Sequence, residues 1–250
     1  MASLKSLFGG ARPEVPAASE MQPDVPPADQ MLISTRSIDK SYPVGNGQVF
    51  VLRRVSIDVK PGEFVSIMGP SGAGKSSLLA WLTGVLPPGL AGEGDVLLDG
   101  VSLLPLPAHR RRLGILFQDD LLFPHMSVGE NLGFGLAPGL GRAARLARVE
   151  QALARVELAG FADRDPVSLS GGERARVALL RVLLAEPRAL LLDEPFSKLD
   201  LALRDRFRSL VFQSATHLPV LLVSHDPEDS RAAGGVVLEL RPEHGHGRIR

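Results

Sequence analysis

The chain has 250 residues, in which 28 acidic and 28 basic side chains balance to a formal net charge of zero. This balance provides no global field for nucleic acid or an anionic membrane, so we expect no nucleic acid partner. Cysteine is absent, which excludes disulfides and thiolate metal sites, and every apolar run is far shorter than the ~20 residues that cross a bilayer.

Residues 1–30 differ in composition from the rest of the chain. Prolines recur there among Ala, Ser, Glu, Asp and Gln, with few large apolar side chains. Such a segment cannot bury enough apolar surface to offset its ordering entropy, which predicts a disordered tail. Gly9 and Gly10 interrupt the start of an apolar run, which disfavours a signal peptide. Met31 directly precedes the first predicted strand and is an alternative start, so the folded domain is expected over residues 31–250.

The first part of this domain is dense in predicted strands. Residues 32–38 alternate loosely between polar and apolar side chains, and Asn46-Gly47 between two short runs is a hairpin signal. Residues 55–59 alternate as in a half-buried strand, and residues 95–98 form another short apolar run before a turn. This pattern predicts an antiparallel sheet ahead of a parallel core.

Residues 69–76, Gly-Pro-Ser-Gly-Ala-Gly-Lys-Ser, fit the phosphate-binding pattern G-x-x-x-x-G-K-[ST] at every fixed position. The apolar run 64–68 before it predicts a buried parallel strand, and residues 76–82 after it predict a helix. Glycines let backbone N–H groups surround phosphate oxygens, and the helix N-terminus adds positive potential. Lys75 is expected at the β- and γ-phosphates and Ser76 on Mg²⁺. An ordinary glycine-rich turn is the alternative, but the strand–loop–helix context favours binding of a nucleoside triphosphate by Gly69, Pro70, Ser71, Gly72, Ala73, Gly74, Lys75, Ser76 and Ser77.

The middle of the chain is predicted to be helical. Over residues 142–158, apolar residues recur at helical spacing (Leu146, Val149, Leu153 and Val156), and arginines occupy other positions on the wheel. A basic binding face is one interpretation of these arginines. A solvated face is favoured, because glutamates interrupt them and no aromatic side chains interleave.

Two further segments supply groups for phosphate chemistry. Residues 189–194 form an apolar run that ends in Asp193 and Glu194, and in an α/β sheet that end faces the ligand crevice. Asp193 is placed to hold Mg²⁺ through its waters and Glu194 to polarise an attacking water, whereas a surface carboxylate pair is the alternative. The stretch Leu-Ser-Gly-Gly-Glu at 169–173 precedes a predicted helix, with Ser170 as N-cap and two glycines whose N–H groups can face an anion.

In this combination and order, the phosphate loop, Leu-Ser-Gly-Gly and Leu-Leu-Leu-Asp-Glu-Pro resemble the motifs of ATP-binding cassette (ABC) ATPases. The resemblance extends over about residues 32–240. It implies an α/β fold, in which a P-loop NTPase core with a parallel sheet bears an N-terminal antiparallel β-subdomain and an inserted α-helical subdomain at about 119–170. It also implies ATP and Mg²⁺ as ligands. Because the sequence ends at Arg250, no C-terminal regulatory β-domain is expected.

Further residues match motifs of that family. Tyr42 occupies the place of an aromatic that stacks on adenine, Gln118 that of the Q-loop glutamine, and His225 that of the switch histidine. Residues 197–200 are similar to the D-loop, which crosses a dimer interface. The resemblance thus implies catalytic roles for Glu194, His225, Gln118 and Lys75. It implies that Mg²⁺ is held by Ser76, Gln118 and Asp193. Besides the phosphate loop, the residues implied to bind ATP are Tyr42, Ser170, Gly171, Gly172, Glu173 and Asp200. Glu173 and Lys198 depart from the Gln and Ala that are frequent at their positions, and activity is expected to survive both.

The resemblance implies the ATPase subunit of a transporter. Two copies are expected to form a homodimer around two ATP, with Ser170 and Gly172 acting on the ATP bound by the other copy. Residues 123–131 look like the stretch that contacts a separate transmembrane permease in bacterial importers, and an extracytoplasmic solute-binding protein would complete the complex. The subunit would be peripheral, on the cytoplasmic face of the inner (plasma) membrane, and would drive solute import.

Two other functions stay open. An exporter or lipid-processing ATPase that also uses a separate permease is one alternative, although the Phe-Pro-His segment at 123–125 disfavours it. A soluble ABC protein acting on DNA or ribosomes is disfavoured, because the chain shows one cassette, no heptad repeat and no basic stripe. The resemblance is closest to short importer ATPases of the thiamine, iron(III), polyamine and sulfate type, and thiamine-like cargo is the expectation. The resemblance also implies that the cassette itself does not contact cargo.

Overall fold

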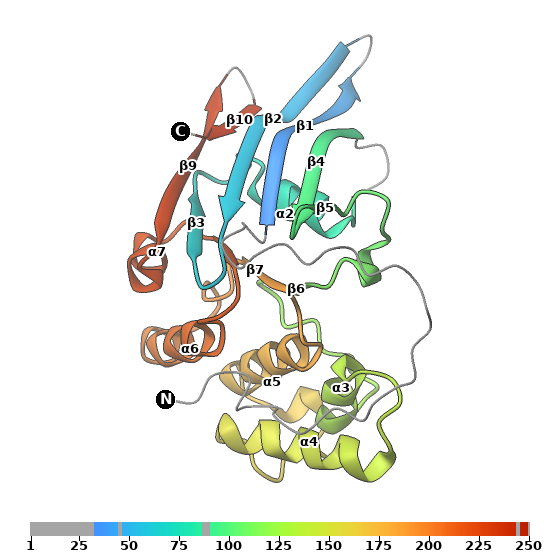
Figure 1. The fold of residues 1–250 in the computed structure, drawn as a ribbon. Helices are drawn as coiled ribbons and strands as arrows, with labels where there is room; N and C mark the ends of the chain where they lie inside the picture. The colour runs from blue at the N-terminus through green and yellow to red at the C-terminus, as the bar shows by residue number, and fades with distance from the viewer. Residues whose placement is uncertain (1–32, 45–46, 87–90, 244–245, 250) are drawn as a thin grey trace.

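The computed structural model describes residues 33–44, 47–86, 91–243 and 246–249 (Figure 1). The tail predicted over residues 1–30 therefore lies outside the described residues. The strands are β1 Ile33–Val44, β2 Gly47–Val59, β3 Phe64–Met68, β4 Ala91–Leu98, β5 Val101–Ser102, β6 Leu113–Leu116, β7 Ala189–Asp193, β8 Val220–Val223, β9 Val236–Glu243 and β10 His246–Ile249. The helices are α2 Lys75–Thr83, α3 Val128–Gly135, α4 Arg142–Arg155, α5 Gly171–Leu184, α6 Leu201–Ser214 and α7 Pro227–Ala233, with 3₁₀ turns at Ala108–Arg110 and Pro166–Ser168.

The strands form one sheet with the order β5-β4-β1-β2-β10-β9-β3-β8-β7-β6. From β9 to β6 all neighbours run parallel, and β3, which was predicted from the run 64–68, lies between β8 and β9. From β5 to β2 the neighbours run antiparallel. The predicted combination of a parallel core and an antiparallel front is therefore confirmed.

The hairpin predicted at Asn46-Gly47 joins β1 to β2. These strands pair antiparallel and end with Val44 opposite Gly47, while Asn46 itself lies outside the described residues. Irregularities in the register of β1 fall after Thr35, which is fully buried and accepts a hydrogen bond from the Ile57 N–H through its hydroxyl (2.8 Å). This side-chain bond satisfies a backbone donor where the ladder shifts.

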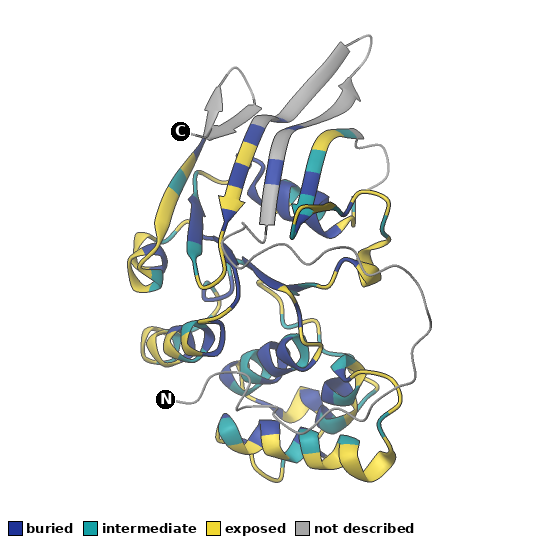
Figure 2. Cartoon of the chain, in the orientation of Figure 1, coloured by how far each residue is buried: buried dark blue, intermediate teal, exposed yellow. Residues whose placement is uncertain are grey.

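The central parallel strands β3, β7 and β8 are buried on both faces, which explains their continuous apolar runs, whereas β9 is largely exposed. In β7, Ala189 and Leu191 belong to a core shared with α2, whereas Leu190 and Leu192 belong to a core shared with α5 and α6. This alternation follows from the two-residue period of a strand. Figure 2 shows the same arrangement as dark strands between helices whose outer faces are exposed.

Helices α3, α4 and α5 form a layer with its own apolar core, at the end of the molecule opposite the antiparallel strands (Figure 1). Val149, Leu153 and Val156 of the predicted helix enter that core. Leu146, which was expected on the same face, is instead 58% exposed, because it lines an open groove between α3 and α4 rather than the core. No helix among the described residues is long and apolar enough to span a bilayer.

Candidate functional site

Three parallel strands bring several of the predicted site residues to one edge of the sheet. The phosphate loop follows β3, and His225 lies just beyond β8. Asp193 is the last residue of β7, and Glu194 follows it. The registers Ile67↔Val223 and Asp193↔Val223 show that these strands end at the same level. Ligands of open α/β sheets bind outside the carboxyl ends of the strands, which is where these groups meet.

The phosphate loop has the backbone geometry that a phosphate cradle requires. Gly69 (φ 157°) and Gly74 (φ 94°) lie in the region that favours glycine, and a Cβ at Gly69 would collide with the Leu240 carbonyl oxygen. Gly74 is the N-cap of α2, and no side chain caps this helix and no acidic residue lies in its first turn. The first N–H groups of α2 are therefore available to an anion, with the positive end of the helix dipole behind them.

Lys75 lies inside this cradle. The residue is only 6% exposed, and its Nζ donates to the carbonyl oxygens of Gly69 (2.8 Å) and Pro70 (2.9 Å). Carbonyl oxygens are weaker partners for an ammonium than phosphate oxygens, because bonds between two charged groups are stronger. The ammonium is thus held within the loop by two carbonyl contacts that a phosphate could replace.

Ser76 and Asp193 are neighbours at the same edge. The Ser76 hydroxyl donates to Asp193 Oδ1 (3.2 Å). Burial raises the pKa of Asp193, and Glu194 raises it further, while the Ser76 hydrogen bond and Lys75 oppose the shift. Among the described residues no group of three or more His, Cys, Asp or Glu could hold a metal. One hydroxyl and one carboxylate suit Mg²⁺, which usually takes one or two protein oxygens and completes its shell with phosphates and water.

Glu194 and His225 face each other across the ends of β7 and β8. His225 Nδ1 lies 2.8 Å from Glu194 Oε2, a hydrogen bond whose donor depends on the imidazole tautomer. Glu194 has a left-handed backbone (φ 48°), a conformation that costs a non-glycine residue about 1–2 kcal/mol. Its N–H donates to the Val223 carbonyl (2.9 Å), which holds this conformation. The contact leaves Glu194 Oε1 able to accept a proton from water.

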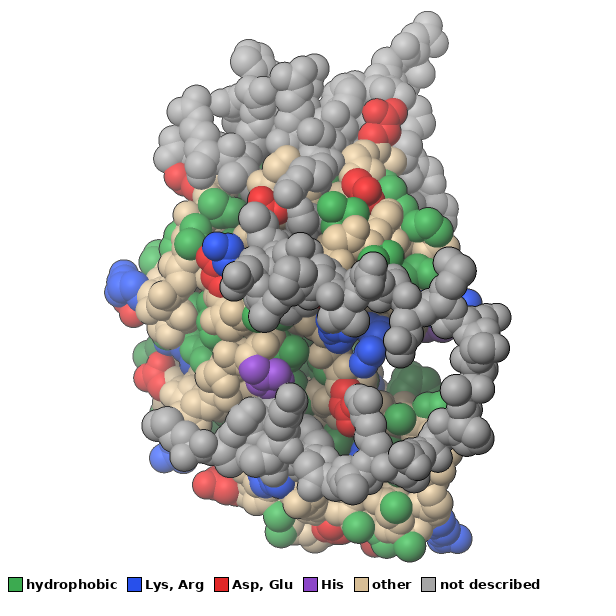
Figure 3. Space-filling model, viewed as in Figure 1, with side chains coloured by type: hydrophobic (Ala, Val, Ile, Leu, Met, Phe, Trp, Pro, Cys, Tyr) green, Lys and Arg blue, Asp and Glu red, His purple; other side chains and the backbone are tan. Residues whose placement is uncertain are grey.

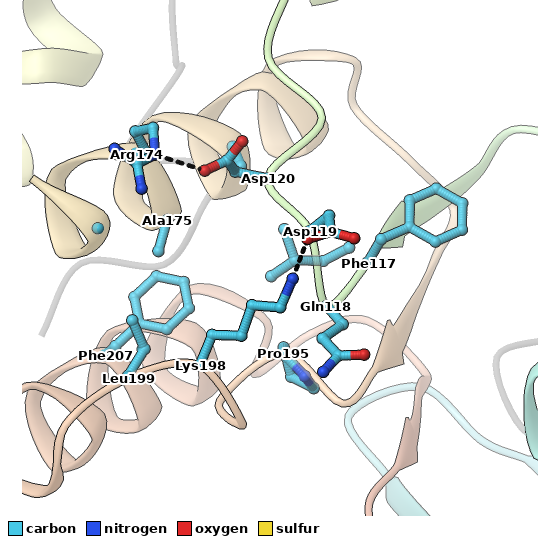
Figure 4. A pocket seen from close by; sticks show the side chains of 13 residues that line it. Phe117, Gln118, Asp119, Asp120, Arg174, Ala175, Pro195, Lys198, Leu199 and Phe207 are labelled. Carbon is cyan, nitrogen blue, oxygen red and sulfur yellow. Dashed lines mark hydrogen bonds and ion pairs between the residues drawn. The ribbon is translucent and has the colours of Figure 1, made fainter. Parts of the chain in front are cut away.

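Gln118 lies in the loop after β6, away from these hydrogen bonds but beside the same edge. The loop lines a cavity of ≈ 190 Å³ together with the start of α5 and the turn after β7 (Figure 4). Gln118 is exposed and lines this cavity together with Pro195, the residue that follows Glu194 (Figure 4). The two acidic residues that follow Gln118 bind cations on opposite sides: Asp119 binds Lys198, and Asp120 binds Arg174.

Ser170 begins α5 as predicted, but its partner was not foreseen. The Ser170 hydroxyl donates to Glu173 Oε2 (2.7 Å) and accepts from the Glu173 N–H (3.3 Å), while the Ser170 N–H donates to the same carboxylate (2.7 Å). These bonds from Ser170 lower the pKa of Glu173. Ser170 and Gly171 are exposed, whereas Gly172 packs against Leu203 of α6. The Ser-x-x-Glu spacing is a capping-box signal that the sequence contained.

Two predicted ATP-binding residues, Asp200 and Tyr42, belong to other secondary-structure elements. Asp200 is the N-cap of α6 and accepts from the Leu203 N–H (3.0 Å). Tyr42 lies in β1 opposite Val49. Their contacts with ATP stay predictions, as do the roles of the other residues of the site.

A buried ion network supports the segment that carries His225. Asp229 is 3% exposed and accepts from Arg208 Nε (2.7 Å) and the Ser224 hydroxyl (2.5 Å). Arg204 holds Asp226, the residue after His225, at 2.7 Å. Sequence reasoning missed this network, because its partners come from α6 and α7 and no local spacing relates them.

The comparisons with known proteins agree with this geometry. The sequence profile described as ABC transporter matches residues 52–197. The chain is 49% identical over 189 residues to the uncharacterized ABC transporter ATP-binding protein YnjD of Escherichia coli, a match that covers 75% of this chain and 87% of that protein. It is 47% identical over 173 residues to the thiamine import ATP-binding protein ThiQ of Cereibacter sphaeroides (68% and 74% covered).

A polyamine relative and a solved structure extend the comparison. The spermidine/putrescine import ATP-binding protein PotA 1 of Pseudomonas aeruginosa is 42% identical over 205 residues, which cover 79% of this chain and 55% of that longer protein. A dimeric post-hydrolysis structure of the ATP-binding cassette MJ0796 bound to ADP and Pi superposes with a TM-score of 0.72 at 29% identity. That superposition covers 87% of this chain and 97% of the cassette.

Proposed function

Because the chain belongs to the ABC transporter family of ATP-binding proteins, we propose that it is the ATP-hydrolysing subunit of a solute importer. The partners proposed are a second copy of the chain, a transmembrane permease and an extracytoplasmic solute-binding protein, with the subunit at the cytoplasmic face of the membrane. The observation that supports this most directly is the phosphate loop beside the Glu194–His225 pair at one sheet edge. The import ATP-binding proteins among the relatives support the direction of transport.

ATP binding follows from the loop geometry. The N–H groups at the start of α2 and the Lys75 ammonium would take the β- and γ-phosphates, with Lys75 exchanging its two carbonyl contacts for phosphate oxygens. Ser76 and Asp193 would hold Mg²⁺, with Gln118 completing the site from the loop after β6. Bound there, Mg²⁺ would neutralise charge on the phosphates. The desolvation that raises the pKa of Asp193 also favours a cation beside it.

Hydrolysis requires a base and a group that stabilises the departing phosphate. A water oxygen attacks the γ-phosphorus, the bond from that phosphorus to the bridging oxygen breaks, and ADP leaves with the electron pair. Glu194 accepts the proton of the water through Oε1, while its hydrogen bond to His225 through Oε2 holds the carboxylate in place. His225 can then turn its other nitrogen towards the phosphate.

The segment 169–173 at the start of α5 would act on the ATP of a second copy. Ser170 and Gly171 are exposed there, so the Ser170 hydroxyl would exchange its bond to Glu173 for a phosphate oxygen and the Gly171 N–H would donate beside it. In a two-fold dimer the same pair of surfaces meets twice, so two ATP molecules are enclosed. The dimeric MJ0796 cassette supports this arrangement.

Replacing Glu173 by Gln should favour this dimer. The ionised Glu173 accepts the Ser170 hydroxyl, so it places a negative charge where the γ-phosphate of the partner's ATP would arrive. Two unit charges about 4 Å apart in water repel by about 1 kcal/mol, so the ATP concentration for half-maximal dimerisation should fall about fivefold. The glutamine oxygen can still accept from the Ser170 N–H and preserve the cap. The measurement is an ATP titration followed by size-exclusion chromatography.

The matched control is Glu130→Gln, since Glu130 makes the same capping box with Ser127 at the start of α3. This variant should dimerise at the same ATP concentration as the unmodified protein. An unchanged or increased ATP requirement in Glu173→Gln would show that the carboxylate does not repel the phosphate.

The groove between α3 and α4 is the proposed contact for the permease. It encloses ≈ 1220 Å³, and Phe134 (67% exposed) and Leu146 (58% exposed) line it beside Met126. Exposed apolar side chains gathered on one groove are typical of an interaction site. The segment predicted to touch the permease, residues 123–131, leads into α3 and contributes His125 and Met126 to the lining. Among the described residues visible in Figure 3, acidic and basic side chains are interspersed rather than gathered into the single-sign patch that nucleic acid binding favours.

Phe134→Asp should separate the subunit from its permease. A central aromatic anchor often dominates an interface, so we expect binding to membranes that contain the cognate permease to weaken about tenfold or more. Co-sedimentation with those membranes is the measurement, and Val167→Asp is the control, because Val167 is 72% exposed but does not line the groove. Equal loss in both variants would argue against the groove. The ligand of the cognate solute-binding protein would identify the cargo, for which thiamine and polyamines are the candidates that the relatives suggest.

A further inference from the structure

The loop that carries Gln118 is held between two parts of the molecule. On one side Asp120 binds Arg174 of α5 (2.8 Å), and Arg181 of the same helix donates to the carbonyl oxygens of Leu121 (2.9 Å) and Asp120 (3.2 Å). On the other side Asp119 forms an ion pair with Lys198 (Figure 4). The loop thus bridges α5 and the turn that follows β7.

That turn is compact and carries Glu194 at its start. The Glu194 carbonyl accepts from the Ser197 N–H (3.3 Å) and from the Ser197 hydroxyl (2.8 Å), and the Leu199 N–H donates to the Phe196 carbonyl (3.2 Å). Phe196 is fully buried and anchors the turn in the core. A movement of Lys198 therefore also moves the backbone close to Glu194, which lies four residues earlier in the same turn.

Gln118 immediately precedes Asp119. The ion pair therefore joins the backbone next to Gln118 to the turn that follows Glu194 in the chain. The bonds to Arg174 and Arg181 orient the loop relative to α5, and the pairing of Leu116 with Leu192 brings the start of the loop close to the end of β7. Beyond these strand ends, the Asp119–Lys198 pair ties the loop to the turn through side chains. Both side chains are more than half exposed, so the pair adds little to folding and salt can open it.

We propose that Asp119 and Lys198 are positioning residues that hold Gln118 at its working distance from Glu194 during ATP hydrolysis. This rests on the proposed roles of Gln118 and Glu194 at the attacked phosphate. Lysine stands here in place of the alanine that is frequent at this position of the D-loop, so the link belongs to this chain rather than to the motif as such.

The test is a double-mutant cycle on ATP hydrolysis by the full chain, with Asp119→Asn, Lys198→Met and the double variant. Each single variant should lower kcat about threefold, because small displacements of positioned groups slow a reaction, and leave KM for ATP unchanged. The double variant should fall no further than either single variant, and Lys198→Arg should keep at least about half of kcat. Raising the salt concentration should slow the unmodified protein towards the rate of Lys198→Met and leave that variant unaffected.

Arg231→Met provides the matched control, since Arg231 pairs with Glu228 on α7, is similarly exposed and lies outside the site. Its kcat should match that of the unmodified protein. Unchanged kcat in Lys198→Met, losses that add up in the double variant, or a rise in KM instead of a fall in kcat would overturn the positioning role. Failure of the unmodified protein to hydrolyse ATP with Mg²⁺ would overturn the proposed function instead.

Discussion

Glu194→Gln should slow ATP turnover by at least about a hundredfold and leave a stable ATP-bound dimer. General-base catalysis typically contributes 10²–10⁴-fold, and an amide cannot accept the proton that the attacking water loses. The substitution keeps the shape of the side chain and can still pair with His225, 2.8 Å away in the structure. The phosphate loop is untouched, so ATP binding persists while the step that reopens the dimer is blocked.

Phosphate release measures the turnover, and size-exclusion chromatography with and without ATP measures the dimer. Glu228→Gln serves as the control, because Glu228 is an exposed carboxylate at the start of α7 that pairs with Arg231. It should hydrolyse ATP normally and show no trapped dimer. Turnover in Glu194→Gln within about threefold of the unmodified protein would remove Glu194 from its proposed role.

The parts of this site that lie within one short segment were predictable from the sequence. The phosphate loop follows from glycine spacing, and its position after a buried strand fixes which sheet edge it occupies. Asp193 and Glu194 were predictable for the same reason, since a strand buried on both faces must end where the next polar residues begin. In each case the chain itself relates the residue to the element that positions it.

The contacts between segments were not predictable in the same way. The Asp119–Lys198 pair joins residues 79 positions apart, and the Arg208–Asp229 bond joins α6 to α7. Such pairs depend on how elements pack, which a single sequence does not record. Leu146 shows the complementary error, because its helical spacing is that of a core residue although the structure leaves it in an open groove.

The Ser170–Glu173 pair lies between these cases. The spacing predicts a capping box, so the contact was predictable from the sequence, although the family motif implies a nucleotide contact for the same residues. Both functions can use the same residue, because the cap is needed to start α5 and the hydroxyl remains exposed. The start of α5 is therefore stable in a single copy. Its exposed residues can still contribute to an ATP site that only a second copy completes.

Mixing two inactive variants should restore hydrolysis if the ATP sites are shared between copies. Lys75→Met removes the ammonium of the phosphate loop, and Ser170→Asp keeps a good N-cap on α5 but repels a phosphate there. Alone, each variant forms dimers with two defective sites and should lose at least about 90% of its turnover. A mixed dimer unites both defects in one site and leaves the other site complete.

At equal concentrations about half of the dimers are mixed, and each has one complete site, so the mixture should recover about a quarter of the unmodified turnover. Phosphate release from the mixture, compared with the mean of the two variants alone, is the measurement. Lys75→Met mixed with the double variant Lys75→Met/Ser170→Asp is the control, because no dimer in that mixture has an intact phosphate loop. If the first mixture stays at the mean, Ser170 acts within its own copy, and the shared-site dimer is wrong even if Glu194 is the base.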